Sequence, residues 1–228
     1  MCGRFAQCAD ADTLARQFEL ETVPALTPRY NVAPTQPVLA VRIGDSGRRE
    51  LTALRWGLVP SWSKGPDNRY SMINARAETV AEKPAYRAAF ARRRCLIPAD
   101  AFYEWRAGAH GKVPHAIRRE DGAPFAMAGL WEHWTGADGS EIASCTIIVT
   151  DANALLAPIH DRMPVILDAA DYDAWLDPGA ADKPALLSLL KPAGPEGWTA
   201  YPVSHAVNSP RNDSPTLLQP QPSLDASG

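Results

Sequence analysis

The sequence predicts a single α+β domain built on a curved, largely antiparallel β-sheet with short flanking helices. Strand-like stretches dominate the chain, and they follow one another as adjacent hairpins instead of alternating one for one with helices. The chain has 228 residues, of which 46% are hydrophobic, and no internal repeat. It is therefore long enough to bury one substantial core.

The predicted helices are short. The first covers residues 10–20, where Asp10 or Asp12 can cap the start and Leu14 and Phe18 share one face. Further helices are predicted from helix-like composition, and in one case from acidic residues in the first turn, over residues 83–93, 169–176 and 182–191.

The predicted strands are β-branched or aromatic runs bounded by Pro, Gly, Asp or Asn. They cover residues 37–43, 50–59, 94–99, 115–119, 125–134, 141–150, 163–167 and 199–204. The end of the chain, "QPQPSLDASG", is rich in Pro and Ser, so we expect one domain over residues 2–215 and a disordered tail over 216–228.

Composition excludes several classes of protein. The sequence has no apolar run of about 18 residues and no signal peptide, so we expect a cytoplasmic protein without a membrane segment. Its four cysteines form no CxxC pair, which predicts free thiols and neither a zinc framework nor a disulfide scaffold. A net charge of -3 opposes nonspecific coating of nucleic acid but leaves room for a local basic groove.

The chain begins "MCGRF", which places a cysteine directly behind the initiator methionine. Cysteine is small enough for aminopeptidase to remove Met1, so we expect Cys2 to become the mature N-terminus. Such a residue carries a free amine and a thiol together. The other cysteines, Cys8, Cys95 and Cys145, are interpreted as small buried packing residues.

Two polar clusters interrupt apolar stretches. In "SMINARAET", Asn74, Arg76 and Glu78 form either a functional group of side chains or the capped end of a strand that turns into a helix. In "PADAFYEWR", Glu104 lies between Tyr103 and Trp105. Burial between aromatic rings would raise the pKa of this carboxyl toward the range useful for proton transfer, whereas a position on the wet face of a strand would not.

Two further clusters lie in loops. "LLAPIHDRMPVIL" sets His160, Asp161 and Arg162 before a strand, where the histidine is either a catalyst or a structural residue with satisfied hydrogen bonds. "RWGLVPSW" brackets a Gly and Pro loop with Trp56 and Trp62, which either fill the core or stack on a base.

Together these stretches resemble one family. "MCGRF", "YNVAPTQ", "RWGLVPSW", "INARAET", "RRCLIPADAFYEW", "AGLWEHW", "TIIVTDAN", "IHDRMPVIL" and "VSHAVNSPRND" are similar in order and spacing to the SOS-response-associated peptidase (SRAP) family of abasic-site sensors. Ala101 stands where the family usually has glycine. The resemblance implies a barrel-like sheet, binding to single-stranded DNA with covalent joining to abasic sites, and neither a metal nor an organic cofactor. We expect a monomer.

The residues explain why this chemistry needs Cys2 at the terminus. A neutral α-amine, with an ordinary pKa of about 7.7 to 8.0, attacks the aldehyde of an abasic sugar more readily than a lysine does and gives an imine. The thiol of the same residue can then add to the imine carbon and close a five-membered thiazolidine. An internal cysteine has no free amine and cannot do this.

The family resemblance selects the remaining site residues. His160 suits protonation of the sugar ring oxygen and Glu104 protonation of the leaving hydroxyl, while Asn74 can orient the amine or the sugar. We expect the guanidinium groups of Arg4, Arg76 and Arg162 to hold the phosphates beside the lesion. The indoles of Trp62 and Trp56 are expected to stack on exposed bases. Thr150 lies in a matching stretch, and its role in DNA binding is less defined.

Two other functions stay open at the level of sequence. An N-terminal-nucleophile peptidase would use the Cys2 thiol with His160 as base, although the leader would be a single methionine that general aminopeptidases remove. A noncovalent reader of modified DNA bases would need only the Trp and Arg residues, and it leaves Cys2 unexplained.

Overall fold

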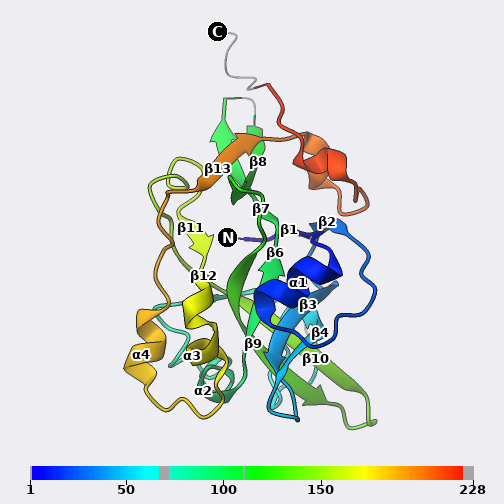
Figure 1. Cartoon of the computed structure of the whole chain (residues 1–228), viewed down its shortest axis with the longest axis vertical. Coiled ribbons are helices and arrows are strands. Elements are labelled where there is room, and N and C mark those ends of the chain that lie inside the picture. The colour runs from blue at the N-terminus through cyan, green and yellow to red at the C-terminus, as the bar shows by residue number, and fades with distance from the viewer. Residues whose placement is uncertain (1, 67–71, 110, 223–228) are drawn as a thin grey trace.

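The structure is a computed structural model that describes residues 2–66, 72–109 and 111–222 (Figure 1). It confirms a single α+β domain made mostly of sheet with a few short helices. The strands are β1 (Phe5–Gln7), β2 (Arg29–Val32), β3 (Pro37–Ile43), β4 (Arg49–Trp56), β5 (Asn74–Arg76), β6 (Arg94–Ala99), β7 (Ala101–Gly108), β8 (Gly111–Arg119), β9 (Phe125–Thr135), β10 (Glu141–Asp151), β11 (Arg162–Pro164), β12 (Ile166–Leu167) and β13 (Trp198–Pro202).

Five strands close into a barrel. They pair in the order β10, β4, β3, β6 and β9, and β9 pairs again with β10. The pairings are antiparallel except that β10 runs parallel to β4 and also to the short strand β5. The expected largely antiparallel, barrel-like sheet is therefore confirmed.

A second sheet has the order β13, β8, β7, β1 and β2. In Figure 1, β1 crosses the middle of the molecule. It pairs antiparallel with β7, with Phe5 opposite Phe102, and the Tyr103 N–H donates to the Arg4 carbonyl at 2.9 Å. This pairing brings the residues that precede β1 beside Glu104.

The barrel strands form two core clusters on opposite faces. On β6, Cys95 and Ile97 belong to one cluster together with Cys2, and the intervening Leu96 belongs to the other. The alternation follows from the two-residue period of a strand. Gly129 on β9 allows a close approach, because a Cβ at this position would lie 2.9 Å from the Cys95 sulfur.

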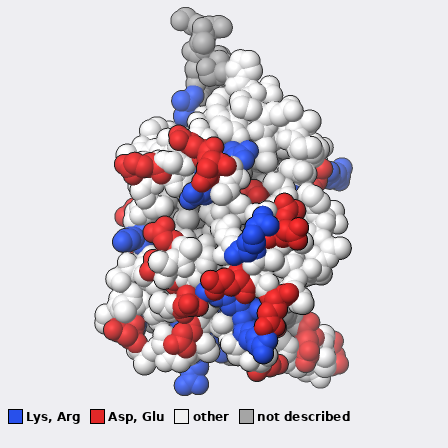
Figure 2. Space-filling view, in the orientation of Figure 1, with Lys and Arg blue, Asp and Glu red and all other residues white. Residues whose placement is uncertain are grey.

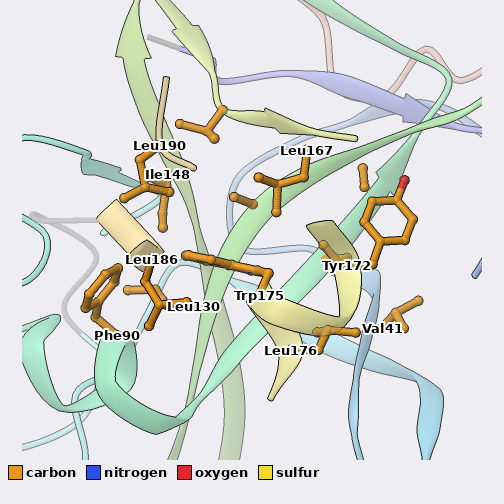
Figure 3. Packing of buried hydrophobic residues seen from close by; sticks show 14 of the residues in the cluster. Val41, Phe90, Leu130, Ile148, Leu167, Tyr172, Trp175, Leu176, Leu186 and Leu190 are labelled. Atoms are coloured by element: carbon orange, nitrogen blue, oxygen red, sulfur yellow. The ribbon is translucent and has the colours of Figure 1, made fainter. Parts of the chain in front are cut away.

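The helices cover the second cluster. In α1 (Ala11–Phe18), Asp10 caps the start by accepting from the Thr13 N–H at 2.8 Å, and Leu14 and Phe18 are buried, as the sequence predicts. Figure 3 shows Trp175 among the side chains of this core. The other helices are α2 (Arg87–Arg92), α3 (Tyr172–Leu176), α4 (Lys183–Ser188) and the 3-10 turns η1 (Ala169–Asp171), η2 (His205–Asn208) and η3 (Pro215–Leu218).

The ordered domain extends beyond the boundary expected at residue 215. Residues 215–218 form η3, Leu217 is buried, and the Gln221 N–H donates to the Pro202 carbonyl at 2.8 Å. The rest of the expected tail, residues 223–228, lies outside the described residues. None of the helices in the described ranges has both the length and the apolar character needed to cross a membrane.

Candidate active site

Cys2 is the central residue of the candidate site and is fully buried. Its carbonyl oxygen accepts a 2.8 Å hydrogen bond from the Asn74 Nδ2 amide. Asn74 is the first residue of β5, which is held parallel to β10 with Asn74 opposite Ile147. Burial, and then the nearby Glu104 carboxylate, raise the pKa of the Cys2 thiol well above its ordinary value. The thiol is therefore uncharged near neutral pH.

Glu104 is a carboxyl group that is only 2% exposed. It lies on β7, a strand that pairs with β1 on one side and β8 on the other. Burial raises the pKa of its carboxyl to about 7, and Asp161 contributes in the same direction. The wet-face alternative for Glu104 is thus wrong, and its proton is exchangeable near neutral pH. The influence of Asp161 also indicates that the loop preceding β11 faces this carboxyl.

His160 lies in that loop. Its Nδ1 accepts a 3.0 Å hydrogen bond from the Arg162 backbone N–H, which favours the neutral tautomer with the proton on Nε2. Burial lowers the pKa of His160, and the Asp161 carboxylate, 2.9 Å from Nδ1, opposes that shift. Because Nδ1 cannot accept from Arg162 and donate to Asp161 at once, and because Asp161 is largely exposed, we assign the backbone hydrogen bond as the dominant one.

The expected DNA contacts occupy different surroundings. Arg76 is exposed on β5 and makes neither a salt bridge nor a side-chain hydrogen bond with any described residue. Arg162 pairs with Glu78 and lies 3.4 Å from Asp151. Trp62 is 68% exposed, the most exposed large apolar side chain of the described chain. Thr150 is almost buried on β10, opposite Met163.

One expected DNA contact, Trp56, requires correction, and a second, Arg4, is partly engaged within the protein. Trp56 is fully buried, its Nε1 donates to the Ile73 carbonyl at 2.9 Å, and Phe5 packs edge-on against its ring, so neither face is open to a base. Arg4 donates to Asn31 at 2.8 Å and to the Val207 carbonyl at 2.6 Å. Its guanidinium ties the start of β1 to β2 and η2, and its side chain is half-buried. Trp56 therefore belongs to the core, whereas contact of Arg4 with DNA stays a prediction.

The sequence interpretation missed two residues beside the site. His115 lies directly opposite Glu104 in the pairing of β7 with β8, which puts both side chains on one face, and it is buried. Tyr86 donates its hydroxyl to the Asn74 carbonyl at 3.2 Å. Neither residue carries a sequence signal, because each reaches the site through pairing or folding between segments far apart in the chain.

The described residues contain no group of three or more His, Cys, Asp or Glu side chains that could hold a metal ion. The cysteines of the chain are unpaired, with Cys95 and Cys145 buried and Cys8 partly exposed. Basic and acidic side chains are interspersed over the face shown in Figure 2, without a patch of one sign.

Known proteins share this fold and sequence. The Abasic site processing protein YoqW of Bacillus subtilis (strain 168) is 45% identical over 96% of this chain and 99% of its own length. The Abasic site processing protein HMCES of Xenopus tropicalis is 36% identical, over 84% of this chain and 65% of that protein. The crystal structure of a Bacteroides thetaiotaomicron protein superposes with a TM-score of 0.86 at 29% identity, covering 96% of this chain and all of that one.

The profile described as SOS response associated peptidase (SRAP) matches residues 1–210, nearly the whole chain. The resemblance carried by the sequence motifs is thereby confirmed. This chain belongs to the SRAP family.

Proposed function

We propose that this protein processes abasic sites in DNA by joining to them covalently through Cys2. The names of the relatives support the substrate. The observation that carries the chemistry is the arrangement around Cys2, whose carbonyl is held by Asn74 while a buried carboxyl, Glu104, has a pKa of about 7. A residue at this place can react with an aldehyde and exchange protons with a matched acid.

The reaction begins with removal of Met1, which frees the Cys2 amine. The amine nitrogen bonds to the C1′ aldehyde carbon of the ring-opened sugar and gives a carbinolamine. Loss of its hydroxyl as water, with one proton supplied by an acid, leaves a C=N imine. The S–H group of Cys2 then adds across that bond: sulfur bonds to carbon, a proton reaches nitrogen, and a thiazolidine ring closes.

Burial of the thiol suits this order of steps. Because its pKa is raised, the thiol does not compete as a thiolate for the aldehyde before the imine forms. Glu104 gives its proton to the leaving hydroxyl and, as a carboxylate, can accept the thiol proton during ring closure. His160, neutral with its proton on Nε2, donates to the sugar ring oxygen during ring opening. A thiolate-based peptidase is disfavoured by the same burial.

The DNA is held as a single strand. Arg76 and Arg162 provide guanidinium groups for the phosphates beside the lesion, and the exposed Trp62 stacks on an unpaired base. Thr150 on β10 lies opposite Met163, the neighbour of Arg162, and helps to fix the position of β11. These contacts carry no sequence code, so recognition depends on the lesion and on strand geometry.

The test separates the amine from the thiol. Cys2→Ala keeps a processed N-terminal amine but cannot close the thiazolidine, so an imine trapped by borohydride should replace the stable adduct on abasic single-stranded DNA. Blocking removal of Met1 should abolish both products, because an amide nitrogen is not a nucleophile. Cys8→Ala, which changes a cysteine outside the site, is the matched control and should behave like the unchanged protein.

Denaturing gels with and without borohydride give the readout. A heat-resistant adduct from Cys2→Ala without borohydride, or full activity with Met1 retained, would falsify the aminothiol mechanism.

A further inference from the structure

Three hollows lead away from Trp62 across the surface of α2. The first, about 320 Å³, is lined by the loop that carries Trp62 and Lys64. The second, about 400 Å³, lies between Trp62 and the start of α2 and reaches Arg87. The third, about 570 Å³, lies between α2 and α4. Because Trp62 lines the first two and Arg87 lines the last two, the three hollows are neighbours along the surface, and we call this series the path.

The cations along this path are unpaired. Lys64, Arg87, Arg92 and Lys183 line the hollows and are exposed, and none makes a salt bridge or a side-chain hydrogen bond within the described part of the chain. Several other arginines of the surface form ion pairs, such as Arg48 with Glu21. The path therefore carries four cationic side chains that have no ion-pair partner among the described residues.

Three acidic residues near the path are already engaged. Glu132 lines the second hollow, is 5% exposed and pairs with Arg93 at 2.9 Å. Beside the third hollow, Asp177 accepts from the Gly179 N–H at 2.8 Å, and Asp182 caps α4 by accepting from the Ala185 N–H at 3.0 Å. These carboxylates serve the backbone or a neighbouring arginine.

The path is joined to the candidate active site. The hydroxyl of Tyr86, the residue directly before α2, donates to the carbonyl of Asn74, whose side chain holds Cys2. Arg87 follows Tyr86 in the chain. The third hollow also has an apolar lining from Phe90 and Leu186 beneath its basic rim. Apolar surface with cations at its edge suits base faces and phosphates together.

We propose that this path, formed by Trp62, Lys64, Arg87, Arg92 and Lys183 and called here the basic track, binds the single-stranded DNA that extends from one side of the lesion. The proposal rests on the proposed function, since it takes the lesion to lie at Cys2. The strand passes Trp62, crosses α2 at Arg87 and ends in the hollow between α2 and α4. Each unpaired cation takes one phosphate.

The experiment measures the salt dependence of binding. The probes are single strands with a tetrahydrofuran residue in place of the abasic sugar, which has no aldehyde and cannot form an adduct. One probe has about four nucleotides, and two have about 16, with the long flank on the 5′ or the 3′ side. The variant carries Arg87→Gln, Arg92→Gln and Lys183→Gln. Its control, Arg16→Gln with Arg48→Gln and Arg119→Gln, loses the same charge outside the basic track.

The measured quantity is the slope of log affinity against log salt concentration. For one of the two long probes, this slope should be smaller in magnitude by roughly 2 in the track variant, because three phosphate contacts are lost and each contributes about 0.7. The short probe and the control variant should keep their slopes. Unchanged slopes for both long probes would overturn the proposal, and an acidic peptide would then be the better candidate ligand for the hollow between α2 and α4. An equal loss with the short probe or the control would overturn it as well.

Failure of the proposed function would look different. A short strand with a true abasic sugar tests the adduct alone, and the track variant should form that adduct at the unchanged rate. If the unaltered protein forms no adduct while the track variant still loses slope on one long probe, the basic track stands and the covalent mechanism fails.

Discussion

At the scale of single residues, burial decides which side chains can act. Trp56 and Trp62 flank the same loop, yet the first is fully buried and the second is 68% exposed, so only Trp62 can meet a base. Glu104 lies on a strand whose neighbours are also buried, and the loss of water raises its pKa to about 7. The sequence leaves a buried and an exposed position open for each of these residues, and only the packing of the folded chain decides which one is adopted.

Glu104 should make stability depend on pH. The folded pKa of about 7 exceeds the ordinary glutamate value of about 4.3, so the folded protein binds this proton more tightly. The stabilising contribution is complete below about pH 4.3 and is lost as the pH rises through about 7. Glu104→Gln stays neutral and should gain up to about 3 kcal/mol of unfolding free energy, relative to the unchanged protein, between about pH 4 and pH 8.

Urea unfolding of both proteins at the two pH values measures this gain. The matched control is Glu196→Gln, which replaces one exposed carboxyl by the same amide. A constant difference between Glu104→Gln and the unchanged protein at both pH values would contradict an elevated pKa.

At the scale of elements, regular patterns were predictable and short paired strands were not. The strands over 37–43 and 94–99 match β3 and β6, and the first helix has its predicted cap and buried face. The interpretation did not separate β1, β2 and β5, which have three or four residues each, too few for a recognisable period. It also did not list β7 among the strands, although β7 has eight residues and carries Glu104. β1 pairs with β7, β2 pairs with β1 and β5 pairs with β10, and these pairings also place Cys2 and Asn74 in the site.

Arg94 connects the ends of two helices. It is 2% exposed, its Nε donates to the Trp175 carbonyl at 2.6 Å, and its Nη1 donates to the Phe90 carbonyl at 2.6 Å. Its Nη2 donates to the Asp177 carbonyl. Arg94→Met keeps an apolar stem but leaves these helix-end carbonyls unbonded, so it should cost at least about 3 kcal/mol of unfolding free energy.

Chemical denaturation provides the measurement, with Arg92→Met as the control. Arg92 lies on the same helix with its side chain exposed, and its replacement should change the free energy of unfolding by no more than about 0.5 kcal/mol. Equal effects of the two substitutions would show that Arg94 does not join α2 to α3.

At the scale of the whole molecule, the arrangement of the two sheets assembles the site. The barrel supplies Asn74 through β5 and Arg162 through β11, whereas the second sheet supplies Glu104 through β7. β1 carries Cys2 to the place where these contributions meet. Sequence motifs identified the individual residues, but the parallel pairing of β10 with β4 and β5 joins distant segments and follows from no local pattern.

This arrangement should restrict the substrate to single strands and to junctions with duplex. Cys2 is fully buried, so a lesion must enter the protein to reach it, while Trp62 stands exposed on the loop beside β4. A partner strand running through the site would have to separate from the lesion strand, which costs a few kcal/mol for each unstacked step.

We expect adducts on abasic single strands and at single-strand-to-duplex junctions, and much slower formation at a lesion in the middle of a long duplex. Gel assays of these substrates at equal lesion concentration test this, with Trp62→Ala expected to reduce the yield most at the junction. Equal rates on all of them would mean that the site accepts an intact duplex.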